Sequence, residues 1–259
     1  MKKSVVLIGI GEIGGVFARG ILKSGYPLIP VTRQMNTDTL SRQIPDPEAV
    51  VVAVAEKDLQ DVLKSMPKLW QDKLILLQNE LLPRDWQLYG ITSPTVISVW
   101  FEKKPGQDVN VLIPSPVFGP KAHLIEAALT SIKISVRVLQ SDDELLFELV
   151  LKNLYILTVN ICGLSMGGGT VFELWNNHQS FALEVSSDVL DIQEFLAGKN
   201  FNRKQLIDGM LKAFEGDWQH KCLGRTAQAR LVRSVGLADQ AGLKVNKLRE
   251  ILAKPAERK

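Results

Sequence analysis

One stretch near the start of the chain constrains the fold more than any other. The apolar, β-branched run 5–8 leads into Gly9-x-Gly11-x-x-Gly14, and a helical pattern follows at once. Strand, glycine turn and helix in this order are what a dinucleotide-binding βαβ unit needs, because the glycines permit a tight turn and close approach of the backbone to a pyrophosphate. A plain structural turn is the alternative. The expected cofactor-binding residues of the turn are Gly9, Gly11, Glu12, Ile13 and Gly14.

The end of the second expected strand, 26–32, bears on the choice of cofactor. At this point of a βαβ unit an acidic residue accepts the 2′-hydroxyl of NAD, whereas an arginine accommodates the 2′-phosphate of NADP. The chain has Thr32 and Arg33 here and no acid. We therefore expect NADP, as NADPH, to be the cofactor. A solvated loop position for Arg33 is the alternative.

Strands and helices alternate along the first 140 residues. Apolar runs at 49–54 and 73–77 are typical of strands buried on both faces of a parallel sheet. Asn79 follows the second run, and the carboxyl ends of parallel strands face the ligand crevice, so we expect Asn79 to contact nicotinamide or substrate. A self-bonded turn residue is the alternative. Other expected elements are strands over 95–100, 109–113 and 133–139, helices over 58–66 and 121–131, and a proline-rich loop over 114–120.

The pattern changes near residue 140. Ser141 and Glu144 have the spacing of a capping box, and no convincing strand follows. The fold class is therefore predicted to be α/β: a Rossmann, doubly wound, mostly parallel sheet that binds NADP over 1–140, then an all-helical substrate or dimerisation domain over 141–259. The expected helices cover 142–163, 171–176, 180–197, 203–214, 220–241 and 246–252.

Composition argues against several classes of function. A net charge of +3 over 259 residues, without long basic runs, argues against nucleic acid and suits a small anionic ligand. Two isolated cysteines and three scattered histidines lack metal-ligand spacing, so no metal is expected, and unpaired cysteines fit the cytoplasm. The apolar span 145–166 is long enough to cross a bilayer. Glu148 and Lys152 within it favour a buried core helix, so no membrane is expected.

The expected helix over 142–163 carries few polar residues. Lys152 and Asn160 are eight residues apart and lie close to one face. Such groups must find partners or face a cleft. After a Rossmann domain, this position predicts a catalytic Lys152. A lysine that reaches the surface and a core asparagine bonded to backbone are the alternative.

These motifs in combination resemble the ketopantoate reductase (2-dehydropantoate 2-reductase) family and the wider group of 6-phosphogluconate dehydrogenase-like folds with helical C-terminal domains. The resemblance implies that Lys152 donates a proton, that Asn79 contacts cofactor and substrate, and that Asn160 binds substrate. It also implies a role in pantothenate biosynthesis. The residues that carry it are the glycine turn, Arg33, Leu77-Gln78-Asn79, Phe118-Gly119-Pro120, Lys152 and Asn160.

The chain departs from the family pattern at the substrate positions. The family has asparagines four and eight residues past the lysine, but Ile156 takes the first of these places. The family's late serine and glutamate, which hold pantoate, have no convincing match. The corresponding region carries His220, Lys221 and Arg225, which we expect to bind a carboxylate or phosphate of the substrate. A solvated amphipathic helix face is the alternative.

The expected function is NADPH-dependent reduction of a ketopantoate-like 2-oxo acid to the 2-hydroxy acid, by hydride transfer in the cleft between the domains. Lys152, Asn79 and Asn160 are the expected catalytic residues, with the lysine supplying the proton. A non-catalytic NADP-binding sensor or interaction protein derived from such a reductase is the alternative, and an imine reductase on the same layout is a third. The apolar C-terminal helices could serve a homodimer.

Overall fold

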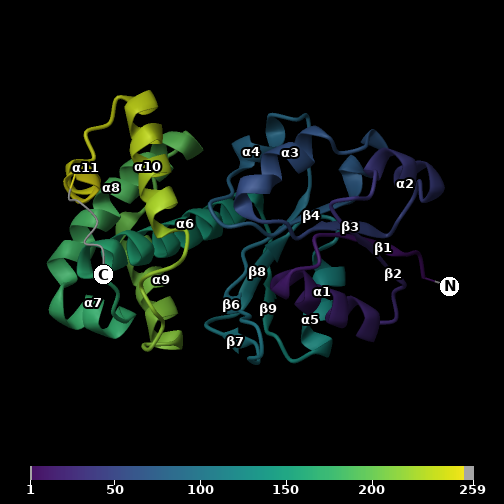
Figure 1. The fold of residues 1–259 in the computed structure, drawn as a ribbon, viewed down its shortest axis with the longest axis horizontal. Helices are drawn as coiled ribbons and strands as arrows, with labels where there is room; N and C mark the ends of the chain where they lie inside the picture. The colour runs from purple at the N-terminus through teal and green to yellow at the C-terminus, as the bar shows by residue number, and fades with distance from the viewer. Residues whose placement is uncertain (1, 254–259) are drawn as a thin grey trace. The chain divides into compact units, whose positions relative to one another are not determined.

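The computed structural model describes residues 2–253 (Figure 1). The chain divides into two compact units, Met1–Leu149 and Val150–Lys259. The division falls inside the long helix α6 (Asp142–Met166). Each unit has its own architecture, and the two are described in turn.

A seven-stranded sheet in the order β2-β1-β3-β4-β5-β8-β9 forms the centre of the N-terminal unit. The first five strands are parallel, with Ile8 level with both Val31 and Val52, so the carboxyl ends of β1, β2 and β3 meet at one edge. The chain passes from β1 to β2 on one side and then to β3 on the other. This reversal is a topological switch point, the place where open α/β sheets bind ligands. The strands are β1 (Val5–Ile8), β2 (Leu28–Val31), β3 (Ala49–Val52), β4 (Leu74–Leu76), β5 (Thr95–Ile97), β8 (Ser115–Phe118) and β9 (Val136–Val138).

Helices cover both faces of this sheet. Figure 1 shows α1 (Glu12–Lys23) and α5 (Ala122–Ser131) on one face, and α3 (Leu59–Lys64) and α4 (Pro83–Gln87) on the other. Helices α1 and α5 approach closely, since a Cβ atom at Gly20 would lie 2.5 Å from the Ala128 carbonyl oxygen. A short helix α2 (Thr37–Gln43) and 3-10 turns η1 (Glu56–Asp58) and η2 (Lys68–Lys73) complete the connections. The predicted α/β class with a mostly parallel sheet is confirmed.

In the second half of this unit one prediction is wrong, and a predicted strand is shorter than expected and lies in a second sheet. The proline-rich stretch 114–120 is not a loop, because β8 (Ser115–Phe118) lies in the main sheet, antiparallel to β5 and parallel to β9. Pro116 is tolerated in the strand because its carbonyl oxygen still accepts a hydrogen bond from the Ser98 amide. Proline has no backbone N–H, so the sheet lacks one donor at this position. The expected strand over 109–113 forms β7 (Asn110–Val111), which pairs only with β6 (Phe101–Glu102) in a separate hairpin.

The C-terminal unit is helical, as predicted. It consists of the later part of α6 with α7 (Val171–Asn177), α8 (Gln179–Ala197), α9 (Arg203–Gly216), α10 (Ala227–Ala241) and α11 (Asn246–Ala253). The Ser141 hydroxyl accepts the Glu144 amide at 3.2 Å and caps α6, whereas the Glu144 carboxylate bonds the Gln140 amide. Among residues 2–253, α6 is the one helix long and apolar enough to cross a membrane, and 78% of its most apolar window is buried inside the protein. Such burial is typical of a core helix.

The expected helix over 220–241 begins only at Ala227. The residues before it pair with a distant segment instead of forming a helical turn. The Cys222 amide donates to the Gly169 carbonyl oxygen, the His220 carbonyl oxygen accepts the Val171 amide, and Lys221 forms an antiparallel bridge with Thr170. A tertiary partner therefore takes the backbone groups that a helix would have used.

Candidate functional site

The glycine turn lies at the switch point of the sheet, and its glycines fall into two kinds. A Cβ atom at Gly9 would lie 2.7 Å from the Ala53 carbonyl oxygen, and one at Gly14 would lie 2.1 Å from the Gly9 carbonyl oxygen. These two glycines permit close packing of strand and helix. A Cβ atom at Gly11 or Gly15 would meet nothing within 4 Å. Their backbone therefore borders open space at the N-terminus of α1, where a pyrophosphate would fit.

A hollow of about 320 Å³ opens beside Gly11 and Gly15. Lys103 reaches it from the residue after β6, and its Nζ lies 3.2 Å from Glu12 Oε2. Glu12 is exposed in the first turn of α1, and Ile13 is half-buried. Sequence reasoning missed Lys103, because nothing in the sequence links it to a turn some 90 residues earlier. The residues that line the hollow are Ile10, Gly11, Glu12, Gly15, Val16, Arg19 and Lys103.

Thr32 and Arg33 follow β2, as expected, and both are exposed. The Arg33 side chain is 86% exposed, and its Nη2 donates to Asp58 Oδ2 at 3.1 Å. Asp58 ends the turn η1 after β3. The end of β2 carries no carboxylate, but the turn after β3, which is separated from β2 by β1, supplies one. This carboxylate contacts the arginine that we expect to bind a 2′-phosphate.

Asn79 lies at the carboxyl end of β4, and its Nδ2 donates to Glu56 Oε1 at 3.0 Å. This bond leaves the Asn79 carbonyl oxygen as the group that can accept a hydrogen bond from a ligand amide. Gln78 fixes the position: its buried side chain donates to the Val52 carbonyl oxygen at 2.6 Å and accepts the Leu77 amide at 3.1 Å. The next residue, Glu80, has φ of +59°, which is costly for a residue other than glycine. The self-bonded turn considered for Asn79 is not observed.

Lys152 is half-buried on α6, in the C-terminal unit. Its Nζ lies 5.5 Å from the centre of the Tyr155 ring. The centre of the His220 ring lies 5.9 Å from the centre of the same Tyr155 ring. Tyr155 is 1% exposed, so it gives both groups a rigid apolar support. The structure thus brings Lys152 and His220 to one buried aromatic side chain.

Asn160 is also buried, about 12 Å further along the helix axis at 1.5 Å per residue. Its Oδ1 accepts a hydrogen bond from Arg230 Nη1 at 2.9 Å, and Arg230 is itself buried in α10. A Cβ atom at Gly224 would lie 2.7 Å from the same oxygen. Asn160 therefore bonds a side chain from another helix, and its amide NH₂ is the part left to donate to a ligand.

The three expected substrate residues do not lie on a helix face, which corrects the amphipathic-helix alternative. All three precede α10: His220 and Lys221 lie where the chain pairs with residues 169–171, and Arg225 lies in the turn just before the helix. Lys221 and Arg225 are exposed, and only the half-buried His220 joins the cluster around Tyr155.

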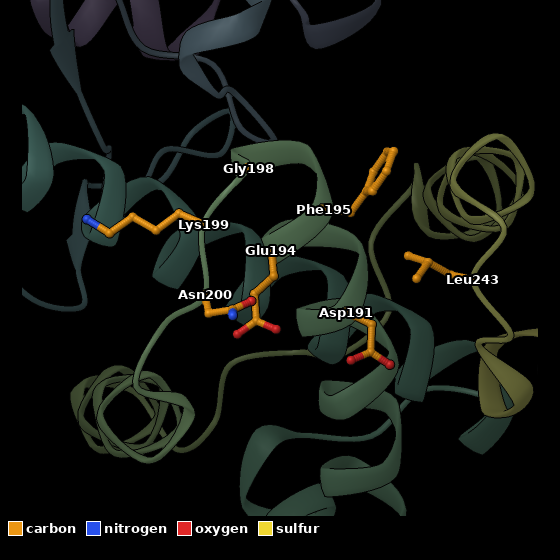
Figure 2. A pocket seen from close by; sticks show the side chains of 7 residues that line it. All are labelled: Asp191, Glu194, Phe195, Gly198, Lys199, Asn200 and Leu243. Atoms are coloured by element: carbon orange, nitrogen blue, oxygen red, sulfur yellow. The ribbon is translucent and has the colours of Figure 1, made fainter.

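Other features of the described chain offer less chemistry. Within residues 2–253, no group of three or more histidine, cysteine, aspartate and glutamate side chains could hold a metal ion. A hollow of about 370 Å³ lies at the end of α8. In Figure 2 its lining residues Asp191 and Glu194 point away from Phe195. Both carboxylates pair with Arg203, so each already has a cationic partner.

Comparison with solved structures identifies the fold over nearly the whole chain. A ketopantoate reductase from Ralstonia eutropha aligns over 96% of both chains, with a TM-score of 0.69 and 13% identity. A dimeric ketopantoate reductase from Staphylococcus aureus aligns over 96% of both chains, with a TM-score of 0.65 and 15% identity. The fold is that of the ketopantoate reductases. A D-mandelate dehydrogenase in complex with NADH shares it, over 96% of both chains, with a TM-score of 0.67 and 11% identity.

No protein-family model and no curated protein matches the sequence itself. At 11–15% identity the structural likeness shows the fold alone. The resemblance predicted from short motifs is therefore confirmed at the level of fold, and the roles of individual residues rest on the geometry of this chain.

Proposed function

We propose that the protein is an NADPH-dependent reductase that converts a ketopantoate-like 2-oxo acid to the 2-hydroxy acid. The observation that carries this proposal is the glycine turn at the switch point, whose Gly11 and Gly15 border open space. The polar residues at the ends of β2 and β4, and the fold shared with ketopantoate reductases and a D-mandelate dehydrogenase, support it. We infer that Thr32 and Arg33 bind the adenosine end of the cofactor and that Asn79 contacts its nicotinamide.

Each polar residue has a role that follows from its contacts. When bound, NADPH supplies the hydride that reduces the carbonyl carbon of the substrate. The carbonyl oxygen gains negative charge as it is reduced, and the Lys152 ammonium stabilises that charge and gives the proton. Asn160, whose oxygen is held by Arg230, presents its NH₂ group to a substrate oxygen. Asn79 presents its carbonyl oxygen, since Glu56 holds its NH₂ group.

The substrate is proposed to be a small anion. Lys221 and Arg225 bring positive charge to the segment before α10. We infer that His220, the member of this group nearest Lys152, contributes most to binding. Ile156 is half-buried where the family has an asparagine, which favours a substrate with a more apolar group than pantoate at that point. We propose a cytoplasmic protein, since Cys162 and Cys222 are unpaired, and a homodimer by analogy with the dimeric Staphylococcus aureus enzyme.

A panel of 2-oxo acids with apolar, hydroxylated and aromatic side chains tests the proposal. NADPH absorbance is expected to fall with at least one member, ketopantoate among those tried, and the product is expected to be the 2-hydroxy acid. The matched control is the same panel with NADH. Binding of NADPH without turnover on any member would instead support the non-catalytic NADP-binding protein, and turnover of a cyclic imine alone would reassign the enzyme.

A further inference from the structure

We propose that Lys103 is a cofactor-binding residue that donates a hydrogen bond to the pyrophosphate of the dinucleotide. This inference rests on the proposed function, since it concerns the same glycine turn. It adds a residue from outside the βαβ unit.

The hairpin of β6 and β7 fixes the position of Lys103. Phe101, in β6, is buried, and its ring centre lies 6.1 Å from that of Phe17 in α1. The Leu112 amide donates to the Trp100 carbonyl oxygen and closes the base of the hairpin. Lys103 is the first residue after β6, so the aromatic contact with α1 holds it beside the N-terminus of that helix. Its side chain is only 20% exposed.

The charges around the hollow suit an anion. Lys103 and Arg19 contribute two positive charges, and Glu12 contributes one negative charge. Gly11 and Gly15 leave the space between these side chains open. Backbone N–H groups at the start of α1 add the positive end of the helix dipole. A phosphate group in this hollow would thus meet a positive surface of backbone and side-chain donors.

The ion pair with Glu12 explains how Lys103 can serve both structure and binding. Its ammonium has three N–H groups. One donates to the Lys104 carbonyl oxygen at 2.8 Å, and a second can serve the ion pair with Glu12 Oε2. One N–H remains for a phosphate oxygen. Glu12 alone would repel a pyrophosphate, and Lys103 cancels that charge at 3.2 Å.

Calorimetric titration of the full-length protein with NADPH tests the inference. Lys103→Gln is expected to weaken NADPH binding about tenfold, the size of one charge-assisted hydrogen bond in a partly exposed site. Lys104→Gln is the matched control, because Lys104 is the neighbouring, more exposed lysine and pairs with Glu102. It is expected to bind NADPH within about twofold of the wild-type protein.

A second variant separates phosphate contact from charge cancellation. If Lys103 merely neutralises Glu12, the double variant Glu12→Gln with Lys103→Gln binds NADPH as tightly as the Glu12→Gln variant, and the inference is overturned. If Lys103 contacts the phosphate, the double variant stays several-fold weaker than Glu12→Gln alone. Unchanged binding in Lys103→Gln also overturns the inference and leaves the proposed function intact. A wild-type protein that binds neither NADPH nor NADH overturns both.

Discussion

At the scale of single residues, the proposed cofactor-binding residue Arg33 makes a contact that the sequence does not reveal. Arg33 was predicted to accommodate a 2′-phosphate from its place after the second strand alone. The structure adds Asp58, whose carboxylate accepts a hydrogen bond from the Arg33 guanidinium. If Arg33 binds a 2′-phosphate, as proposed, that phosphate must compete with the carboxylate, so we expect Asp58 to lower the preference for NADP over NAD.

Two substitutions measure these opposed effects. Arg33→Ala is expected to raise the dissociation constant of NADPH about tenfold and to change that of NADH by less than about twofold, because the 2′-phosphate is the cofactor group that Arg33 is proposed to bind and NADH lacks it. Asp58→Asn is expected to tighten NADPH binding by several-fold. Fluorescence titrations with both cofactors check this. Equal effects of Arg33→Ala on NADPH and NADH would show that Arg33 does not contact the phosphate.

The two buried thiols predict how stability depends on pH. Burial raises the pKa of Cys222 to about 12, with a further contribution from Glu173, and burial also raises the pKa of Cys162. An unfolded thiol ionises near 9. The stabilisation by the protonated thiol is therefore fully present below pH 9 and decreases as the pH rises from 9 towards 12, because the unfolded chain releases protons that the folded chain keeps.

Urea unfolding of the wild-type protein and of Cys222→Ala at pH 8 and pH 10 tests this linkage. The wild-type protein is expected to lose about 1 kcal/mol more than the variant over this interval, since the linkage amounts to at most about 1.4 kcal/mol per pH unit. Identical losses in the two proteins would mean that Cys222 titrates normally in the fold.

At the scale of elements, close approach of α6 to the segment before α10 depends on Gly163. A Cβ atom there would lie 2.7 Å from the Cys222 carbonyl carbon and 2.8 Å from its oxygen, both backbone atoms. Gly163→Ala is expected to destabilise the protein by about 1–3 kcal/mol, despite the better helix propensity of alanine. The matched control is Gly236→Ala in α10, where nothing lies within 4 Å.

The control should stabilise the protein by up to about 1 kcal/mol, from helix propensity alone. Urea unfolding of both variants measures the two changes. If both variants are stabilised equally, the segment before α10 can move away from Gly163 without a loss in the free energy of unfolding, and the prediction is wrong.

The strand β8 and the start of α10 show how much of the fold could be predicted from the sequence. The first five strands, α1 and most C-terminal helices follow from local patterns of apolar residues and glycine. The strand β8 could not be predicted, because Pro114 and Pro116 signal a loop locally, and only the neighbouring strands β5 and β9 show that Pro116 can be tolerated. The start of α10 was missed because residues 220–222 bond to 169–171, a pairing without local signal.

The site follows the same rule. Gly11, Asn79, Lys152 and Asn160 could be selected from sequence because each follows or lies on a predictable element. The partners of these residues could not be predicted from the sequence, because the pairs Arg33–Asp58 and Asn160–Arg230 join residues 25 and 70 positions apart. The candidate residues can therefore be selected from local sequence, whereas the side chains that orient them are seen only in the structure.

At the scale of the whole molecule, the two units divide the chemistry. The N-terminal unit carries the glycine turn, Arg33 and Asn79, and the C-terminal unit carries Asn160 and the cluster of Lys152, Tyr155 and His220. The proposed cofactor-binding residues belong to the βαβ arrangement, whereas the proposed substrate residues differ from the ketopantoate reductase pattern at Ile156 and before α10.

The most direct test of the proposed function removes the proposed proton donor and leaves the rest of the protein unchanged. Lys152→Met keeps the length and apolar stem of the side chain beside Tyr155 but lacks the ammonium. It is expected to bind NADPH within about twofold of the wild-type protein and to lose about 10²–10⁴ in kcat with the best 2-oxo acid, as for the loss of a general acid. Lys204→Ala, an exposed lysine of the same unit, is the control and should keep full activity. An active Lys152→Met enzyme with unchanged kcat would contradict the account.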